Sequence, residues 1–467
     1  MPRFATYIAV AAAKAARFGS RVLRAGSGTT LPGLVAERID PSAIAELSAA
    51  LPDGVIVVTG TNGKTTTAKM LTEILAAGGK RVLTNESGSN LTRGVASTLV
   101  QASRGLGLRI DADVAVFEID EATMAAAMPR LRPSLVVVTN LFRDQLDRYG
   151  ELDKTAAIIG GALRQVEGVT ALLNADDPLV ASLAKDVGGK VVYFGIEDPL
   201  VGTATSTAAM DSKDCVVCGH EYIYNARYFG HLGVWHCPSC GAARPEPSHG
   251  ASRVELSPHR SSFGYSGRTS FDITLGLPGL YNVYNALAAA ALAEEVGIAP
   301  DAITSALAAF SAAFGRMERV TVEGTPAMLL LVKNPTGANQ SLAAVFSDDR
   351  PKTIVFALND NFADGTDVSW IWDVEFEAFD LAGSRFVASG IRADDAGVRL
   401  KYAGLPLDRL EIVPDPVEAC RRASQLVPDG DEISVLPTYT AMMEIRGAYA
   451  PHGDALAGLG AATKRGL

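Results

Sequence analysis

The chain has 467 residues and a formal net charge of −10, with 48% apolar and 20% charged residues. This length suggests about three domains, and the composition is that of a globular protein rather than a disordered one. The acidic balance argues against a protein that grips the nucleic-acid backbone, because that function needs a basic face.

The N-terminal segment, residues 1–50, is expected to be helical and to lie on the rest of the fold. Its most apolar stretch, Ile8 to Ala13, is followed by Lys14 and Arg17. No run reaches the roughly 18–20 apolar residues that a membrane span requires, and no clean cleavage site follows a long apolar core. We therefore expect a cytoplasmic protein, which could still act on a membrane-held substrate.

Short β-branched runs alternate with helical stretches through the first two thirds of the chain. A strand at 55–58 ends in a glycine-rich turn, and a helix is expected over 68–77, which is the first unit of a parallel α/β sheet. Continuous apolar runs, typical of buried parallel strands, follow at 114–117, 135–138, 171–173 and 191–194. Residues 51–318 are thus predicted to form a central domain, with an insertion at 205–252 and an alanine-rich helix within 276–296.

A second α/β domain, Rossmann-like, is expected over residues 319–467. Its buried strands are predicted at 353–358, 385–388 and 410–413, with helical stretches between them. Strands that alternate with helices in this way favour another parallel sheet.

The loop Gly60-Thr61-Asn62-Gly63-Lys64-Thr65-Thr66 stands between the first strand and the first helix of the central domain. Successive backbone N–H groups and the N-terminus of a helix form a cradle for phosphate. Glycines let the backbone approach the ligand closely, Lys64 brings charge to the β- and γ-phosphates, and the Thr65 hydroxyl can bind Mg²⁺. The sequence therefore predicts ATP binding, in a loop shorter than the usual G-x-x-x-x-G-K-[ST] spacing.

An acidic strand end and a pair of asparagines extend the predicted nucleotide site. Glu118 follows the buried run at 114–117 and can hold Mg²⁺ beside the loop, although a solvated carboxylate is the competing interpretation. Asn282 and Asn285 are three residues apart and share one helix face. A side-chain amide suits the edge of an adenine, but helix capping explains the same pair.

Four of the five cysteines form two C-x-x-C pairs, each followed by a glycine: Cys215, Cys218, Cys237 and Cys240. This spacing matches a four-cysteine zinc ribbon, and reduced thiols or a redox pair are the alternative. With every ligand position filled by cysteine, the zinc would be structural. The neighbouring His220, His231 and His236 are expected at the surface, and Cys420 is expected to be buried filler.

A loop after the strand at 353–358 concentrates four carboxylates and two tryptophans between Asp360 and Asp373. Loops at the carboxyl ends of strands are where α/β proteins build their sites. From the residues alone, this loop fits a metal site, a catalytic base or an acidic surface.

Together these features resemble the Mur ligase family, whose members join an amine to a carboxylate through an acyl phosphate made from ATP. The resemblance runs from about residue 31 to about residue 439. Its segments are the short phosphate loop, the Glu118 strand end, Asn140–Tyr149, Asn174–Pro178, the asparagine helix and Gly315–Glu318. The cysteine insertion and the Asp360–Asp373 loop narrow the resemblance to the branch of the family that amidates lipid II.

The resemblance implies a role for each site residue. Lys64 and Thr65 bind the phosphates and Mg²⁺, and Glu118 holds Mg²⁺. Asn282 and Arg316 contact the nucleotide. Members of this branch form a heterodimer with a class I glutaminase, GatD, whose Cys-His pair takes its third, acidic member from the synthetase subunit. That position matches Asp367, and an acid bonded to one imidazole nitrogen orients the ring.

The chain departs from the wider family pattern at two places. Gln145 stands where most members carry a histidine, and residues 155–161 contain no lysine where most carry a carbamylated one, Lys154 being the nearest. The usual ligands of a second Mg²⁺ and the phosphate-bridging lysine therefore have no direct counterpart here.

The implied activity is ATP-dependent amidation of the D-glutamate α-carboxylate in the lipid II stem peptide, at the inner face of the membrane, with ammonia from the glutaminase. The alternative is a stand-alone Mur-like or folylpolyglutamate-like ligase that adds an amino acid, which the cysteine insertion disfavours. A module that grips nucleic acid is disfavoured by the acidic balance and by the lack of an aromatic-basic stripe. A C-terminal domain that serves only as an interaction platform is a third interpretation.

Overall fold

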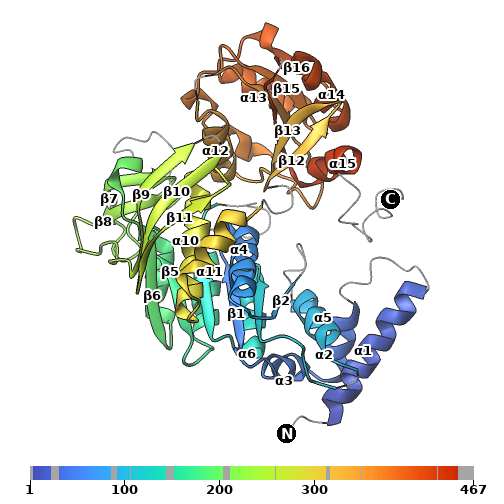
Figure 1. Ribbon diagram of the computed structural model, residues 1–467. Helices are drawn as coiled ribbons and strands as arrows, with labels where there is room; N and C mark the ends of the chain where they lie inside the picture. Colours follow the sequence, from blue (N-terminus) through green and yellow to red (C-terminus); the bar gives the residue numbers. More distant parts are fainter. Residues whose placement is uncertain are drawn as a thin grey trace.

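The structure is a computed structural model that describes residues 4–22, 31–85, 92–105, 107–143, 152–202, 211–257, 259–311, 316–348, 350–428 and 430–450. Figure 1 shows an N-terminal group of helices, a large central sheet with helices on both faces, and a second sheet at the C-terminal end.

Three helices form the N-terminal flank of the molecule: α1 (Phe4–Val22), α2 (Leu31–Ile39) and α3 (Ala43–Ser48). Gly33 N on α2 donates to Ser97 Oγ at 2.8 Å, which joins this flank to α5 (Thr92–Ala102) of the central body. Within the described residues, no helix is both long enough and apolar enough to cross a bilayer.

The central sheet has nine strands in the order β11-β10-β9-β6-β5-β4-β1-β3-β2. From β2 to β9 all neighbouring strands are parallel. The valine- and isoleucine-rich runs thus form the buried strands that the sequence predicted. The strands are β1 (Val55–Thr59), β2 (Val82–Thr84), β3 (Val114–Glu118), β4 (Leu135–Val138), β5 (Thr170–Asn174), β6 (Lys190–Ile196), β9 (His249–Ser257), β10 (Arg260–Ser266) and β11 (Ser270–Leu275).

The expectation of a parallel central sheet is wrong at one end, where β10 pairs antiparallel with both β9 and β11. Two residues separate β9 from β10, and three separate β10 from β11. Connections this short join antiparallel neighbours, because a parallel pair needs a crossover of a dozen residues or more. The central sheet is therefore mixed.

Helices cover both faces of the central sheet. Ile56 and Val58 of β1 belong to a buried cluster with α4 (Lys64–Ala77), α10 (Leu280–Glu295) and α11 (Pro300–Ala309). Val55 and Val57 point to the other face, into a cluster with α5, α6 (Met124–Leu131) and α8 (Leu152–Leu163). Because both faces of β1 are covered, the loop that follows it leaves a rigid, fully buried strand.

The cysteine-bearing insertion contains the antiparallel hairpin of β7 (Ile223–Phe229) and β8 (Leu232–His236). Trp235 Nε1 donates to the Ala175 carbonyl at 3.0 Å, and Arg244 Nε donates to Asp176 Oδ1 at 2.6 Å. Both acceptors follow β5, and the short helix α9 (Pro178–Ser182) begins just after them. The insertion is thus fixed to the carboxyl end of the central sheet.

The second sheet has six strands in the order β12-β13-β17-β14-β15-β16, and only its β12–β13 pair is antiparallel. The predicted strands at 353–358, 385–388 and 410–413 all lie in it. Its strands are β12 (Arg316–Val322), β13 (Thr325–Leu330), β14 (Thr353–Ala357), β15 (Arg385–Ser389), β16 (Leu410–Ile412) and β17 (Ile433–Pro437). The helices around it are α12 (Pro335–Val345), α13 (Ala393–Tyr402), α14 (Pro416–Leu426) and α15 (Tyr439–Tyr449).

Candidate active site

The predicted phosphate loop lies between the end of β1 and the first turn of α4. Gly60 has φ of 125° and Gly63, the N-cap of α4, has φ of 86°, a region that favours glycine. Thr61 N donates to the Asn140 carbonyl at 2.8 Å, and Asn62 N donates to Asn140 Oδ1 at 2.9 Å. The segment after β4 therefore holds the loop in place at a helix N-terminus, which is an arrangement that binds anions.

Lys64 is buried and turned back along its own loop. Its Nζ donates to the carbonyls of Gly60 and, at 3.3 Å, Thr61, and it lies 3.0 Å from Glu121 Oε2. Burial raises the pKa of Glu121, although the positive charges of Lys64 and Lys333 oppose that shift. Sequence reasoning selected Glu118 in this acidic segment and missed Glu121, because the difference depends on how the chain turns after β3.

Glu118 ends β3, where its Cα pairs with that of Val58 in the neighbouring β1. Its backbone N–H and C=O are both bonded to the side chain of Asn85, each at 3.0 Å. Glu118 therefore lies at the carboxyl edge of the sheet, close to the start of the phosphate loop, and its role in binding Mg²⁺ stays a prediction.

The two asparagines of α10 face the phosphate loop and each other. Asn285 Nδ2 donates to Asn282 Oδ1 at 3.3 Å, and Thr67 Oγ1 donates to Asn285 Oδ1 at 3.4 Å. A Cβ at Gly63 would collide with Asn285 Oδ1, which explains the glycine at this position. The spacing of three residues thus places both amides on one face, as the sequence indicated.

Asn282 also reaches the C-terminal sheet. Its Nδ2 donates to the Pro278 carbonyl at 2.8 Å and lies 3.6 Å from Met317 Sδ. Arg316 is the first residue of β12, and its side chain lies outside the described part of the structure. The predicted Asp144–Tyr149 segment, including Gln145, is likewise outside the described residues.

A second lysine approaches the phosphate loop from the C-terminal sheet, and sequence reasoning did not find it. Lys333 Nζ lies 3.5 Å from the Thr61 carbonyl, and Asn334 Nδ2 donates to Asn62 Oδ1 at 3.2 Å. Asn334 caps α12 by accepting from Gly337 N at 2.8 Å, with Pro335 at the first helical position. The sequence Lys-Asn-Pro after a buried strand carried this signal, since asparagine followed by proline is a typical helix start.

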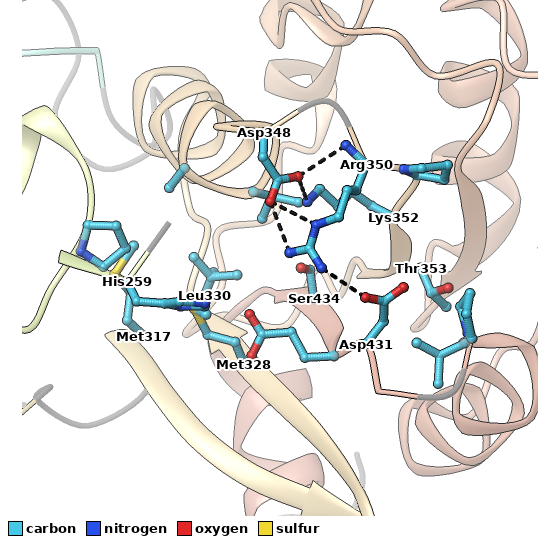
Figure 2. A pocket seen from close by; sticks show the side chains of 17 residues that line it. His259, Met317, Met328, Leu330, Asp348, Arg350, Lys352, Thr353, Asp431 and Ser434 are labelled. Atoms are coloured by element: carbon cyan, nitrogen blue, oxygen red, sulfur yellow. Dashed lines mark hydrogen bonds and ion pairs between the residues drawn. The ribbon is translucent and has the colours of Figure 1, made fainter. Parts of the chain in front are cut away.

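A small cavity of about 50 Å³ lies farther along the same boundary between the two sheets (Figure 2). His259 and Pro278 of the central body line one side of it. On the other side Arg350 bonds Asp348 at 2.9 Å and Asp431 at 3.0 Å. Bonds from Lys352 and then Arg350 lower the pKa of Asp348 to about 2. The charged groups of this wall are thus paired with one another within the C-terminal body.

The carboxylates of the acidic loop between β14 and β15 contact different partners. Asp364 is buried and accepts from Thr440 N at 2.7 Å, Asp360 pairs with Arg392 at 2.7 Å, and Asp373 lies 3.4 Å from Arg143.

Asp367 is exposed and accepts from Ser369 N at 2.8 Å within its own loop, and this interaction lowers its pKa. Phe362 and Trp372 of the same loop are 83% and 51% exposed. Asp373 is exposed as well but lies beside Arg143, whereas Asp367 is hydrogen-bonded to Ser369 of its own loop.

The four paired cysteines converge on one point. Their sulfurs all lie within 4.8 Å of one another, with Cys215 and Cys240 at 3.6 Å and Cys218 and Cys237 at 3.5 Å. A tetrahedral zinc with Zn–S bonds of about 2.3 Å requires sulfurs about 3.8 Å apart, so the cluster fits a metal ion of this size. The fifth cysteine, Cys420, is fully buried in α14, as expected.

The expectation that the neighbouring histidines lie at the surface is wrong for His231, which is fully buried. Its Nε2 lies 3.3 Å from Asp177 Oδ1, and its ring centroid lies 4.6 Å from that of Phe142. Asp177 lies in the connection between β5 and α9, and Phe142 lies in the segment after β4. His231 therefore packs the β7–β8 hairpin against these loops of the central sheet. The local sequence around His231 carries no sign of these distant contacts.

Comparison with known proteins agrees with this geometry. The family model of the Mur ligase middle domain matches residues 58–234, and that of the MurT ligase C-terminal domain matches residues 331–442. A pseudomurein peptide ligase type C from Methanothermus fervidus superposes with a TM-score of 0.66 over 87% of this chain and 80% of its own, at 24% identity. A MurF ligase from Thermotoga maritima, solved in complex with ADP, has a TM-score of 0.61 over 88% and 83%, at 14% identity. The fold is that of a Mur ligase.

Within that class, similarity is high to the lipid II isoglutaminyl synthase (glutamine-hydrolyzing) subunit MurT of Streptococcus pneumoniae, at 35% identity over 91% of this chain and 92% of the relative. The same subunit of Staphylococcus aureus is 33% identical over 85% and 88%. The chain belongs to the MurT family. By contrast, a UDP-N-acetylmuramoylalanine–D-glutamate ligase from Pelotomaculum thermopropionicum matches over 57% of this chain and only 46% of its own length.

Proposed function

We propose that this chain is the synthetase subunit of a glutamine-dependent amidotransferase. It uses ATP to convert the D-glutamate α-carboxylate of the lipid II stem peptide into the amide, giving D-isoglutamine. The observation that carries the proposal is the match to lipid II isoglutaminyl synthase subunits over about nine tenths of both chains, through the phosphate loop and the C-terminal sheet alike.

ATP binds at the phosphate loop, on the side that faces the C-terminal sheet. Loop amides and Lys64 hold the phosphates, and Lys333 adds a second positive charge from the other side. Asn282 and Arg316 contact the nucleotide. Thr65, which is half-buried one residue into α4, and Glu118 hold the Mg²⁺ that screens the phosphate charges.

The reaction has two bond-forming steps. An oxygen of the α-carboxylate attacks the γ-phosphorus, the bond from that phosphorus to the β-phosphate oxygen breaks, and ADP leaves. Ammonia then attacks the acyl carbon, the carbon–oxygen bond to phosphate breaks, and the nitrogen loses a proton. Positive charge from the two lysines favours the first step, because negative charge spreads over the transferring group.

The ammonia comes from a class I glutaminase of the GatD type, bound as the second subunit of a heterodimer. Its Cys-His pair uses Asp367 as the orienting acid. Two features support this assignment, namely that Asp367 is exposed and that its loop also carries large exposed apolar side chains. Phe362 and Trp372 lie in the same loop, and Trp372 stacks edge to face with the exposed Tyr402 at 5.8 Å. Exposed aromatic groups of this kind mark protein interfaces.

The four-cysteine cluster binds one structural Zn²⁺ in a ribbon. The sulfur distances support this, and so does the backbone N–H of Val217, which lies 3.4 Å from Cys215 Sγ and stabilises its thiolate. With four thiolate ligands the ion has no open coordination position, so it organises the insertion and takes no part in the reaction.

The substrate is lipid-linked, so the chain works in the cytoplasm at the inner face of the membrane and needs no nucleic acid. The competing function is a stand-alone ligase that adds an amino acid. To separate the two, the purified chain is given lipid II, MgATP and either ammonium or single amino acids, and the product mass is measured. Amidation by ammonium supports the proposal, and addition of an amino acid would overturn it. The Lys64→Met variant controls for contaminating activity.

A further inference from the structure

The N-terminal helix α1 has an unusual distribution of side chains. The residues that face the body of the protein are small or of medium size, with Ala9, Val10 and Ala13 all buried. The large apolar residues point outward instead, and Phe4 and Phe18 are 80% and 73% exposed. Folding alone does not favour this arrangement, because burying the larger side chains would stabilise the protein more.

The outward residues form one continuous stripe along the helix. Their positions recur at intervals of three and four residues, which places them on a single face. We call this set the outer stripe; it consists of Phe4, Tyr7, Ile8, Ala11, Ala15 and Phe18. A helix of 19 residues is about 28 Å long at 1.5 Å per residue, so the stripe extends over most of that length.

Specific polar contacts anchor the helix to the body of the protein. Thr6 Oγ1 donates to Asp40 Oδ2 at 2.6 Å and lies 2.8 Å from Glu46 Oε2. Farther along, Lys14 Nζ donates to the Gly105 carbonyl at 2.6 Å. Figure 1 shows α1 at the edge of the molecule, beside α2 and α5 and far from the C-terminal sheet. The outer stripe is therefore held in a fixed orientation on an outside face.

The charge of this segment is opposite to that of the rest of the chain. Residues 1–36 contain five lysines and arginines and no acidic residue, a net charge of +5. The whole chain carries −10, so removing this +5 leaves −15 for the remaining residues. A basic segment with an apolar stripe is the composition of a helix that lies in a membrane interface, and basic residues there are attracted to anionic lipid.

We propose that the outer stripe of α1 lies on an anionic phospholipid surface, with its apolar side chains in the headgroup region and the helix parallel to the membrane. The helix docks and does not cross, since it does not combine the length and the apolarity of a membrane span. This surface is separate from the ATP site, and it would hold the enzyme where a lipid-linked peptide can reach that site.

The test is sedimentation of the full-length chain with large unilamellar vesicles made of equal parts phosphatidylglycerol and phosphatidylcholine, or of phosphatidylcholine alone. We expect the chain to partition about tenfold more strongly onto the anionic vesicles, and this preference to weaken at high salt. The triple variant Phe4→Ser/Ile8→Ser/Phe18→Ser should lose about tenfold or more of that binding.

The matched control removes three equally exposed apolar residues elsewhere, Leu200→Ser/Leu256→Ser/Leu407→Ser, and should bind like the parent chain. The proposal is overturned if the parent chain binds neither kind of vesicle, or if the outer-stripe variant binds anionic vesicles as well as the control variant does. It is also overturned if light scattering shows a parent dimer that the outer-stripe variant turns into a monomer, because a second copy then covers the stripe. No substrate is used, so a negative result leaves the proposed amidation untouched.

A second measurement does not depend on how well the triple variant folds. In a Phe18→Trp variant, brominated phosphatidylglycerol should quench the added fluorescence, whereas in Leu200→Trp it should not. Equal quenching in the two variants, or none in either, would contradict the proposed orientation of α1.

Discussion

Lys64 Nζ lies 3.0 Å from Glu121 Oε2, and both side chains are more than nine tenths buried. Lys64, the cation that we assign to the phosphates, is therefore held by the carboxylate of Glu121, which lies in the segment after β3. This contact limits the conformations of a long, flexible side chain before nucleotide binds, which lowers the entropy lost when it engages phosphate.

The pair has a testable consequence for stability. Because burial raises the pKa of Glu121, this carboxyl keeps its proton to a higher pH in the folded state than in the unfolded chain. The free energy of unfolding then falls as pH rises from the ordinary value of 4.5 through the raised value. The positive charge of Lys64 opposes this rise in the pKa of Glu121. Lys64→Met should therefore widen the pH range over which the free energy of unfolding falls, and should destabilise the protein by about 3 kcal/mol near pH 8.

Denaturant unfolding of Lys64→Met near pH 5 and near pH 8 measures this effect. The double variant Lys64→Met/Glu121→Gln has no carboxyl at the position and should lose this part of the pH dependence. Equal pH dependence in the single and double variants would mean that Glu121 does not titrate as described.

Lys333 gives a prediction about catalysis rather than stability. It is only half-buried, so Lys333→Met should change the free energy of unfolding by less than about 1 kcal/mol. By removing a charge beside the phosphate loop it should lower kcat for ATP turnover about a hundredfold. Lys401→Met, an exposed lysine on α13, is the control and should leave kcat unchanged. A loss confined to KM would assign Lys333 to ground-state binding alone.

Asp367→Asn should separate the two nitrogen sources when the glutaminase subunit is present. Glutamine-driven amidation should fall about a hundredfold or more, because asparagine cannot stabilise the imidazolium, while ammonium-driven amidation stays within about twofold. Asp380 accepts from Ala382 N at 3.0 Å in the same local geometry, so Asp380→Asn is a matched control. If both nitrogen sources survive in Asp367→Asn, the orienting acid is another residue.

The effect of Asp367→Asn on glutamine-driven amidation should not depend on pH over a wide range. The hydrogen bonds from Ser369 hold the pKa of Asp367 below its ordinary 3.8, so the carboxylate stays ionised from about pH 5 upward. The ratio of parent to Asp367→Asn rates should therefore be constant between about pH 5 and pH 9. A ratio that changes across this range would show that Asp367 titrates within it.

Thiol counting tests the cysteine cluster. With zinc bound, the native chain should show almost no fast-reacting thiol, and a chelator should release four. The fifth, Cys420, should react only after unfolding, because burial raises its pKa to about 12 and the thiolate is the reactive form. Cys218 and Cys240 are exposed, so their rapid reaction in the untreated, metal-assayed protein would contradict a zinc site.

The elements that could be predicted from the sequence are those whose own residues form a recognisable pattern. The runs of valine and isoleucine at β1, β3, β4 and β14 gave buried strands, and the cysteine spacing gave a cluster that the structure brings together. The strands β9 to β11 were missed because none of them contains a continuous apolar run, and in β11 (Ser270–Leu275) polar and apolar residues alternate.

Features that depend on distant partners were beyond sequence reasoning. His231 is buried because Phe142 and Asp177, far away in the chain, close around it. Lys333 and Asn334 reach the phosphate loop only because the second sheet lies against the first. Local composition cannot report such contacts, since they are set by how the two α/β bodies pack together.

In the proposed reaction, ATP activates the α-carboxylate as an acyl phosphate, which ammonia then attacks. Lipid II labelled with ¹⁸O in the D-glutamate α-carboxylate tests this most directly, with ammonium as the nitrogen source and mass spectrometry of the phosphate released. We expect one ¹⁸O atom in inorganic phosphate for each amide formed. Amide formation with unlabelled phosphate would contradict it, because the carboxylate oxygen would then have left by another route.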